Sequence, residues 1–219
     1  MDYELIVFDW DGTLMDSEAR IIASMQAAFV ELGRSPPPAE AVREVIGLGL
    51  EQAIGRLWPA ASAARRVQAM TGYRQHFLAQ DQTPMPLFSG ATALLRALHR
   101  HGRLLGVATG KSRIGLDQAI ADSGLHGLFQ ATRSADETFS KPHPAMLLEL
   151  MDELGMRPAQ TLMVGDTEYD LQMAANAGVA AVAVTYGAHP RARLLAQQPR
   201  ACVDSLPELA AWLGVGSLD

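Results

Sequence analysis

The segment that decides the fold is Leu5-Ile6-Val7-Phe8-Asp9-Trp10-Asp11-Gly12-Thr13, a short apolar run that leads directly into two closely spaced aspartates. A run without polar alternation is typical of a strand that is covered on both faces of a parallel sheet. Residues two apart in an extended segment point the same way, so Asp9 and Asp11 both face the crevice beyond the strand, where open α/β sheets bind ligands. The alternative is an ordinary turn rich in Asp and Gly.

Further apolar runs extend this pattern along the chain. The expected strands are residues 5–8, 104–108, 161–164 and 179–184, with shorter ones at 129–132 and 201–203. Helical patterns lie between them at residues 89–101, 112–123 and 144–154. Alternating strands and helices predict an α/β fold with a doubly wound, Rossmann-like parallel sheet.

One long stretch has helical patterns only. The expected helices are residues 17–32, 39–46, 50–57 and 61–80. This stretch is longer than an ordinary connecting loop. We therefore predict a small α-helical cap domain at residues 15–82, inserted into a core domain of residues 1–14 and 83–219. A helical bundle packed passively on the sheet is the alternative to a lid over a site.

Composition excludes several classes of protein. The chain has 219 residues, a formal net charge of −6 and 48% hydrophobic residues, which is a globular composition without the basic face of a nucleic-acid binder. Its single cysteine, Cys202, forms no intrachain disulfide and is expected to be a buried structural thiol. No apolar run reaches the length of a membrane span and no leader pattern begins the chain, so a cytoplasmic protein is expected, either monomer or homodimer.

Two acidic residues follow a second apolar strand. In Gly165-Asp166-Thr167-Glu168-Tyr169-Asp170, Asp166 stands at the strand end and Asp170 in the first turn of the next helix. This spacing brings both carboxylates to one side. Magnesium prefers carboxylate oxygens with several waters. Helix capping is the alternative, and it explains one acid well but a cluster of two together with Glu168 less well.

Two further motifs carry groups suited to an anion. Thr109-Gly110-Lys111-Ser112 combines a hydroxyl, a glycine and a helix N-terminus, which together form an anion cradle, although Ser112 alone reads as a plain helix cap. In Ser140-Lys141-Pro142-His143-Pro144, the prolines stiffen the loop that carries Lys141. A lysine held in this way meets a phosphate or a carboxylate as a point charge, and a solvated surface lysine is the alternative.

The four motifs, in this order, resemble those of the haloacid dehalogenase-like phosphohydrolase superfamily, and within it the phosphoglycolate phosphatase-like members. The resemblance covers essentially the whole chain, and the helical insert is similar to the cap of that superfamily. It implies that Asp9 is a nucleophile that forms an aspartyl phosphate. Asp11, which the dehalogenases of the superfamily lack, would protonate the leaving alkoxide and then deprotonate water. Thr109, Gly110 and Lys141 would bind the phosphoryl oxygens.

The resemblance also implies a Mg²⁺ ion held by Asp9, the backbone carbonyl of Asp11 and Asp166, with Asp170 nearby. The physical logic agrees, because four converging carboxylates repel one another and an anionic substrate unless a divalent cation and Lys141 reverse the local field. The expected reaction is hydrolysis of a small phosphomonoester, with 2-phosphoglycolate as the guess. A phosphomutase, a pyrophosphatase and a non-catalytic module that binds a phosphometabolite stay open.

The insert carries several arginines that could meet a carboxylate on the substrate, because a bidentate guanidinium suits that task. They are Arg20, Arg56, Arg65, Arg66 and Arg74. Arg20 lies closest to the first motif and is the candidate we select.

Overall fold

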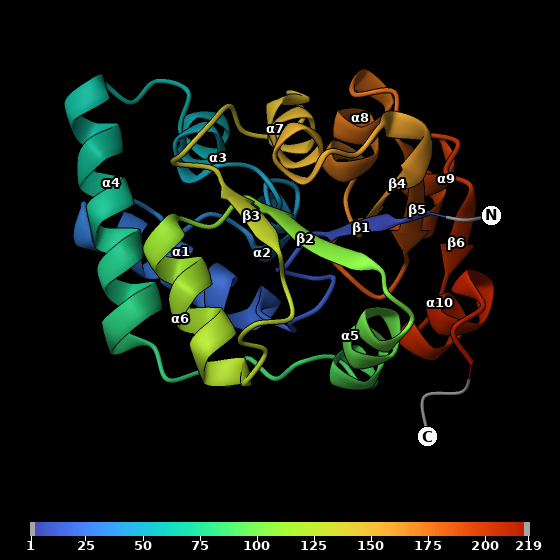
Figure 1. The fold of residues 1–219 in the computed structure, drawn as a ribbon. Coiled ribbons are helices and arrows are strands. Elements are labelled where there is room, and N and C mark those ends of the chain that lie inside the picture. Colours follow the sequence, from blue (N-terminus) through green and yellow to red (C-terminus); the bar gives the residue numbers. More distant parts are fainter. Residues whose placement is uncertain (1–2, 217–219) are drawn as a thin grey trace.

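The computed structural model describes residues 3–216 of the chain. Within this range one six-stranded parallel sheet forms the centre, in the order β3-β2-β1-β4-β5-β6 (Figure 1). Its strands are β1 (Leu5–Phe8), β2 (Leu104–Thr109), β3 (Ala131–Ser134), β4 (Thr161–Gly165), β5 (Ala180–Val184) and β6 (Ala201–Val203). The strand order changes direction at β1, which pairs with β2 on one side and β4 on the other. This is the switch point at which α/β sheets bind ligands.

The register aligns the ends of the three central strands. Phe8 at the end of β1 pairs with Val107 of β2 and with Val164 of β4. Asp9 follows Phe8 directly, and Thr109 and Asp166 each stand two residues beyond these partners. Three of the predicted motifs therefore begin at one edge of the sheet.

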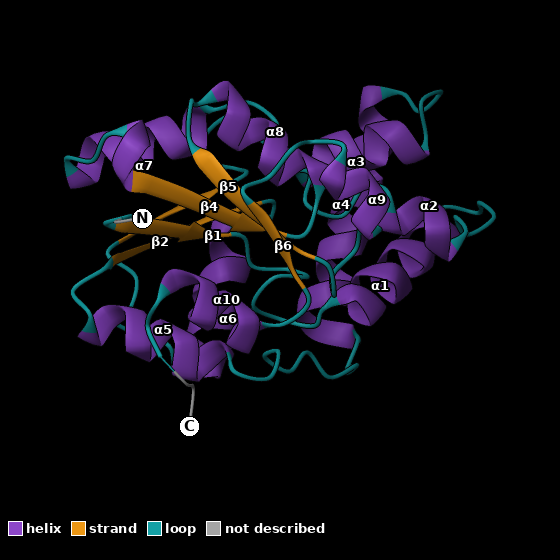
Figure 2. Cartoon of the chain, turned by 90° about the vertical axis from the view of Figure 1, so that its right-hand side faces the viewer, coloured by secondary structure: helices purple, strands orange, loops and turns teal. Residues whose placement is uncertain are grey.

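Helices cover both faces of the sheet, as Figure 2 shows. Ile6 and Phe8 face a core cluster with α5 (Ala91–Arg100), α6 (Arg113–Ser123) and α10 (Leu206–Leu213). Leu5 and Val7 face a second cluster with α7 (Ala145–Leu154), α8 (Glu168–Asn176) and α9 (Arg191–Leu195). Both sets of β1 side chains are buried, which explains why the strand reads as a continuous apolar run.

The helical insert lies between β1 and β2, beyond the carboxyl edge of the sheet (Figure 1). It contains α1 (Glu18–Glu31), α2 (Ala39–Arg43), α3 (Leu50–Leu57), α4 (Ala63–Gln75) and the π-helix η1 (His76–Gln80). It has its own apolar cluster, which includes Met25, Phe29, Ile54 and Phe77. The predicted fold class, a parallel α/β sheet with an inserted helical segment, is confirmed.

Several expected boundaries shift. The strand expected at residues 129–132 begins two residues later, at Ala131, and the Leu105 N–H donates to the Gln130 side chain instead of to a backbone carbonyl. The helix expected at 39–46 ends at Arg43, and the one expected at 61–80 ends as a π-helix. α9 and α10 were not predicted. Cys202 is half-buried rather than buried, and burial raises the pKa of its thiol. No helix in the described range has the length and apolarity that crossing a membrane requires.

A short loop of the insert, residues 47–49, rests on the edge of the sheet. The Gly49 N–H donates to Ser140 Oγ at 2.7 Å. A side chain at Gly110 would place its Cβ 2.6 Å from the carbonyl oxygen of Leu48. Both glycines are therefore required by close approach between insert and core, and the insert is seated against the loop that carries Lys141.

A second contact joins the insert to α8. The Tyr169 hydroxyl donates to the carbonyl oxygen of Glu44 at 2.6 Å and accepts from Arg56 Nη1 at 2.6 Å. Arg193 of the core pairs with Glu44 and, at 2.5 Å, with Glu168. Tyr169 itself is 1% exposed, whereas Glu44 and Arg56 are exposed, so the contact runs from the interior to the surface.

We expect Gly49→Ala to destabilise the protein by roughly 1–3 kcal/mol, because its Cβ would lie 2.9 Å from Ser140 Oγ and 3.2 Å from Ala135 Cβ. The backbone φ of −63° is ordinary, so the cost comes from contact alone. Gly55→Ala is the matched control, since it lies inside α3 against only the tip of Arg66 and gains about 0.5–1 kcal/mol of helix stability. Urea unfolding measures both, and equal stability of the two variants would contradict the close seating of the insert.

Candidate active site

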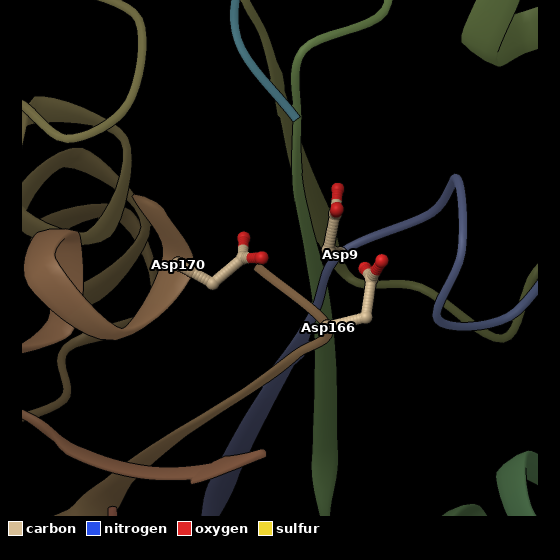
Figure 3. A group of neighbouring side chains, drawn as sticks. All are labelled: Asp9, Asp166 and Asp170. Carbon is tan, nitrogen blue, oxygen red and sulfur yellow. The ribbon is translucent and has the colours of Figure 1, made fainter. Parts of the chain in front are cut away.

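Three buried carboxylates meet where β1 and β4 end (Figure 3). Asp9 follows β1, Asp166 follows β4 and Asp170 lies in the first turn of α8. One oxygen of each lies within 4.8 Å of the others. Glycine makes this packing possible, because a Cβ at Gly12 would lie 2.2 Å from Asp166 Oδ2 and one at Gly165 would lie 2.3 Å from Asp170 Cγ.

Lys141 places a positively charged ammonium group inside this cluster of carboxylates. Its Nζ lies 2.7 Å from Asp9 Oδ1 and 2.6 Å from Asp170 Oδ1, and its side chain is fully buried. Burial disfavours the charged lysine, but the two carboxylates outweigh burial and raise the pKa of Lys141. The ammonium group is therefore firmly protonated, and the alternative of a solvated surface lysine is wrong.

Asp166 and Asp170 are fixed by hydrogen bonds. Asp166 accepts from Thr13 Oγ1 at 2.8 Å and from the Ala188 N–H at 2.8 Å. Asp170 Oδ2 accepts from the Thr167 hydroxyl at 2.7 Å and its N–H at 3.0 Å, which forms a capping box at the start of α8. Asp170 thus caps its helix with one oxygen and turns the other toward Lys141.

Asp9 is different, because its Oδ2 is buried and forms no hydrogen bond with any described residue. Burial raises the pKa of Asp9 well above its usual value, although Lys141 opposes this. Burial and the neighbouring Asp170 raise the pKa of Asp166 to about 7. Three carboxylates share one ammonium, so full ionisation leaves two negative charges uncompensated.

The cluster fits a divalent cation. It offers an oxygen without a partner, a deficit of two positive charges and hard oxygen ligands, which is the donor set that Mg²⁺ and similar ions prefer. The described residues include no other group of three acids, histidines or cysteines close enough to hold an ion.

Asp11 stands apart from this cluster, with other partners. Its Oδ1 accepts from Ser17 Oγ at 2.6 Å and lies 3.1 Å from Lys111 Nζ. Lys111 is a buried site residue that the sequence analysis passed over, although it lies within the quoted motif. Ser112 beside it caps α6 by accepting from the Gly115 N–H, so the capping interpretation of Ser112 is right.

A cavity of about 370 Å³ opens in front of Asp9, between the core and the insert. Asp9, Asp11, Thr109 and Gly110 line it, and the Thr109 hydroxyl accepts from the Lys111 N–H at 3.2 Å. The structure therefore brings the predicted residues together in two groups. Four face the cavity, and the other three are fully buried around Asp9: Lys141, Asp166 and Asp170.

Arg20 does not line this cavity. Its Nε donates to the Thr83 carbonyl oxygen at 2.7 Å, which ties α1 to the segment that returns to the core. The insert arginine that lines the cavity is Arg74, on α4. His143 accepts from the Ala145 N–H and is a loop residue, as expected.

The strand order of this sheet, the acidic cluster at its switch point and the helical insert over that cluster together define a class of protein. Residues 6–184 match the family model described as haloacid dehalogenase-like hydrolase, so the chain belongs to that family.

Relatives are similar over nearly the whole chain. A probable phosphatase, IndB, of Dickeya dadantii is 37% identical over 94% of this chain and 91% of its own. A phosphoglycolate phosphatase of Pseudomonas putida is 30% identical over 94% of this chain and 78% of its own. A solved structure of a predicted phosphatase from Clostridium acetobutylicum, 25% identical, superposes with a TM-score of 0.88 over 97% of this chain and 99% of that one.

Asp9→Asn tests the charge deficit of the cluster. The amide oxygen keeps the contact with Lys141, and the amide nitrogen takes the place of the unpaired Oδ2, so one buried negative charge disappears. In EDTA we expect the variant to melt at the same temperature as the parent or a higher one. Excess MgCl₂ should raise the melting temperature of the parent by several degrees through mass action and raise that of the variant less.

Asp122→Asn, which removes an exposed acid of α6, controls for the change in net charge and should respond to MgCl₂ as the parent does. An Asp9→Asn variant with the full magnesium response would remove Asp9 from the cation site.

Proposed function

We propose that the protein is a Mg²⁺-dependent phosphatase that hydrolyses a small phosphomonoester through an aspartyl phosphate on Asp9. The observation that carries this proposal is Asp9 itself: a carboxylate at the switch point of the sheet, facing the cavity, with one oxygen that bonds to none of residues 3–216. The family membership supports the reaction class, and the relatives named as phosphatases support it further.

In the first step Asp9 attacks phosphorus, and the bond between phosphorus and the ester oxygen breaks. Asp11 gives its proton to the departing alkoxide. Water then attacks the aspartyl phosphate, Asp11 takes a proton from it, and inorganic phosphate leaves. The contacts of Asp11 with Ser17 and Lys111 support this role, because they hold its carboxyl at the cavity wall two residues from the nucleophile.

Binding of the phosphoryl oxygens falls to Thr109, Gly110 and Lys141. Phosphoryl transfer depends mainly on positioning and charge stabilisation, which a fixed ammonium and a tightly seated loop provide. Lys141 has three N–H donors, and its two carboxylate partners leave one for the substrate.

Asp9, Asp166, Asp170 and the backbone carbonyl of Asp11 would hold the cation, which supplies positive charge against the phosphoryl oxygens when bound. Residues 15–82 would act as the cap, and residues 1–14 and 83–219 as the catalytic core. The extreme ends of that core lie outside the described residues.

We expect phosphate release from at least one metabolite phosphate in MgCl₂ and none in excess EDTA. A suitable panel contains 2-phosphoglycolate, sugar phosphates, nucleotides and pyrophosphate. Asp9→Asn should abolish turnover because an amide is no nucleophile, and Asp11→Asn should lower kcat by about 10²–10⁴-fold because proton transfer is lost. Arg20→Ala serves as the control with unchanged kinetics, since the Arg20 side chain bonds to the Thr83 carbonyl oxygen and does not line the cavity.

Other outcomes would reassign the site. An isomeric sugar phosphate without free phosphate would indicate a phosphomutase, and turnover of pyrophosphate alone a pyrophosphatase. Tight binding of a phosphate ester without turnover would indicate a binding module. Full activity in EDTA would remove the metal from the proposal.

A further inference from the structure

Much of the cavity wall that the insert contributes is apolar. Six of its side chains, on α1, α4 and η1, are aliphatic, thioether or aromatic: Ile21, Met25, Met70, Tyr73, Phe77 and Leu78. The polar members that the insert adds to the lining are Glu51, Gln52 and Arg74. Met25 and Phe77 are almost fully buried, and Leu78 at the rim is 36% exposed. The wall therefore runs from the interior of the insert to the solvent.

Local helix geometry turns a stripe of these side chains toward the cavity. Met70, Tyr73 and Phe77 are spaced by three and four residues, so they share one face of the continuous helix formed by α4 and η1. The last turns of that helix are of the π type, which occurs frequently at functional sites. The helix packs on α1 at Gly72, where an added Cβ would lie in ordinary contact with the Ala28 Cβ, at 3.4 Å.

Two of these residues form an aromatic platform. The Tyr73 and Phe77 rings stack with centroids 5.6 Å apart and an interplanar angle of 21°. Lys111 Nζ lies 4.5 Å from the Phe77 ring centroid on the side of Asp11. The platform thus begins directly beside the proposed proton donor, where the organic part of a phosphate ester would leave.

The cavity offers few cationic residues that could bind a carboxylate of the substrate. Of the two cationic residues in its lining, Lys111 is already paired with Asp11, and Arg74 is exposed at the mouth. Asp9 and Asp11 pair with Lys141 and Lys111, so carboxylates of the protein already engage both of these lysines. A cavity of about 370 Å³ lined in this way is typical of a site for a mainly apolar ligand, for which volumes of roughly 300–1,000 Å³ are usual.

We propose that the preferred substrate is a phosphomonoester of an alcohol with an aromatic or similarly apolar body, which packs against Met70, Tyr73 and Phe77. This inference rests on the proposed phosphatase activity and names its substrate class. It differs from 2-phosphoglycolate, whose carboxylate would have to reach the exposed Arg74, because Lys111 is already paired with Asp11.

The test compares three esters of primary alcohols, which present similar leaving groups: ethyl phosphate, 2-phenylethyl phosphate and 2-phosphoglycolate. We expect kcat/KM for 2-phenylethyl phosphate to exceed that for ethyl phosphate by about 10- to 100-fold, because a phenyl group is buried. We expect 2-phosphoglycolate to be no better than ethyl phosphate. Equal rates for the phenylethyl and ethyl esters, or a preference for 2-phosphoglycolate, would overturn the proposal.

A variant connects the preference to the wall. Met70→Gln keeps an unbranched side chain of similar length but places an amide against the ligand, so it should lower kcat/KM for 2-phenylethyl phosphate by roughly 5- to 30-fold and leave ethyl phosphate within about twofold. Met156→Gln is the matched control, because Met156 is partly buried against the core on the far side of the sheet and does not line the cavity. Equal losses on both esters in Met70→Gln would contradict a contact with the organic group.

The results distinguish an error in the substrate class from an error in the proposed phosphatase activity. Absence of phosphate release from every ester, including the ethyl and glycolate esters, removes the phosphatase assignment itself. Turnover of the small esters without a phenyl preference keeps that assignment and removes only the apolar substrate. Melting temperatures of both Gln variants show whether either has lost its fold.

Discussion

The site depends on one buried ion pair network, in which Lys141 lies between Asp9 and Asp170. Removing these charges from water is costly, and one ammonium does not balance three carboxylates when Asp166 is included. The residual negative charge of the three carboxylates favours binding of a divalent cation. The sheet, the capping box of α8 and the seated loop of Lys141 all hold these groups together against their repulsion.

Much of this arrangement depends on short segments of the sequence, and for that reason it could be predicted. Strands buried on both faces appear as continuous apolar runs, and parallel pairing brings their carboxyl ends to one edge, so the residues that follow β1, β2 and β4 had to meet. What escaped prediction depends on contacts between distant segments. The pairing of Lys111 with Asp11 spans 100 residues, and the attachment of Arg20 to Thr83 spans 63. Neither leaves a periodic signal.

The insert touches the core at positions next to the reactive residues. Ser140, which accepts from Gly49, precedes Lys141, and Tyr169, which contacts Glu44 and Arg56, precedes Asp170. The position of the insert therefore affects the positions of Lys141 and Asp170, because each of them is one peptide unit away from a residue that contacts the insert. A displaced insert would release backbone constraints on both sides of the ion pair, and it would also open the cavity to water.

This arrangement separates two tasks. In the proposed reaction the charged groups that act on the phosphoryl group come from the core, whereas the insert contributes apolar side chains whose rings begin beside Asp11. Contacts remote from the reacting bond raise the rate only when they hold the ester in line with Asp9. In the proposed complex, an apolar body packed on Tyr73 and Phe77 would do so without adding a carboxylate to a cavity in which Lys111 is already paired, and its burial would favour the seated insert. Different segments of the chain would then supply the proposed reaction and the proposed selectivity.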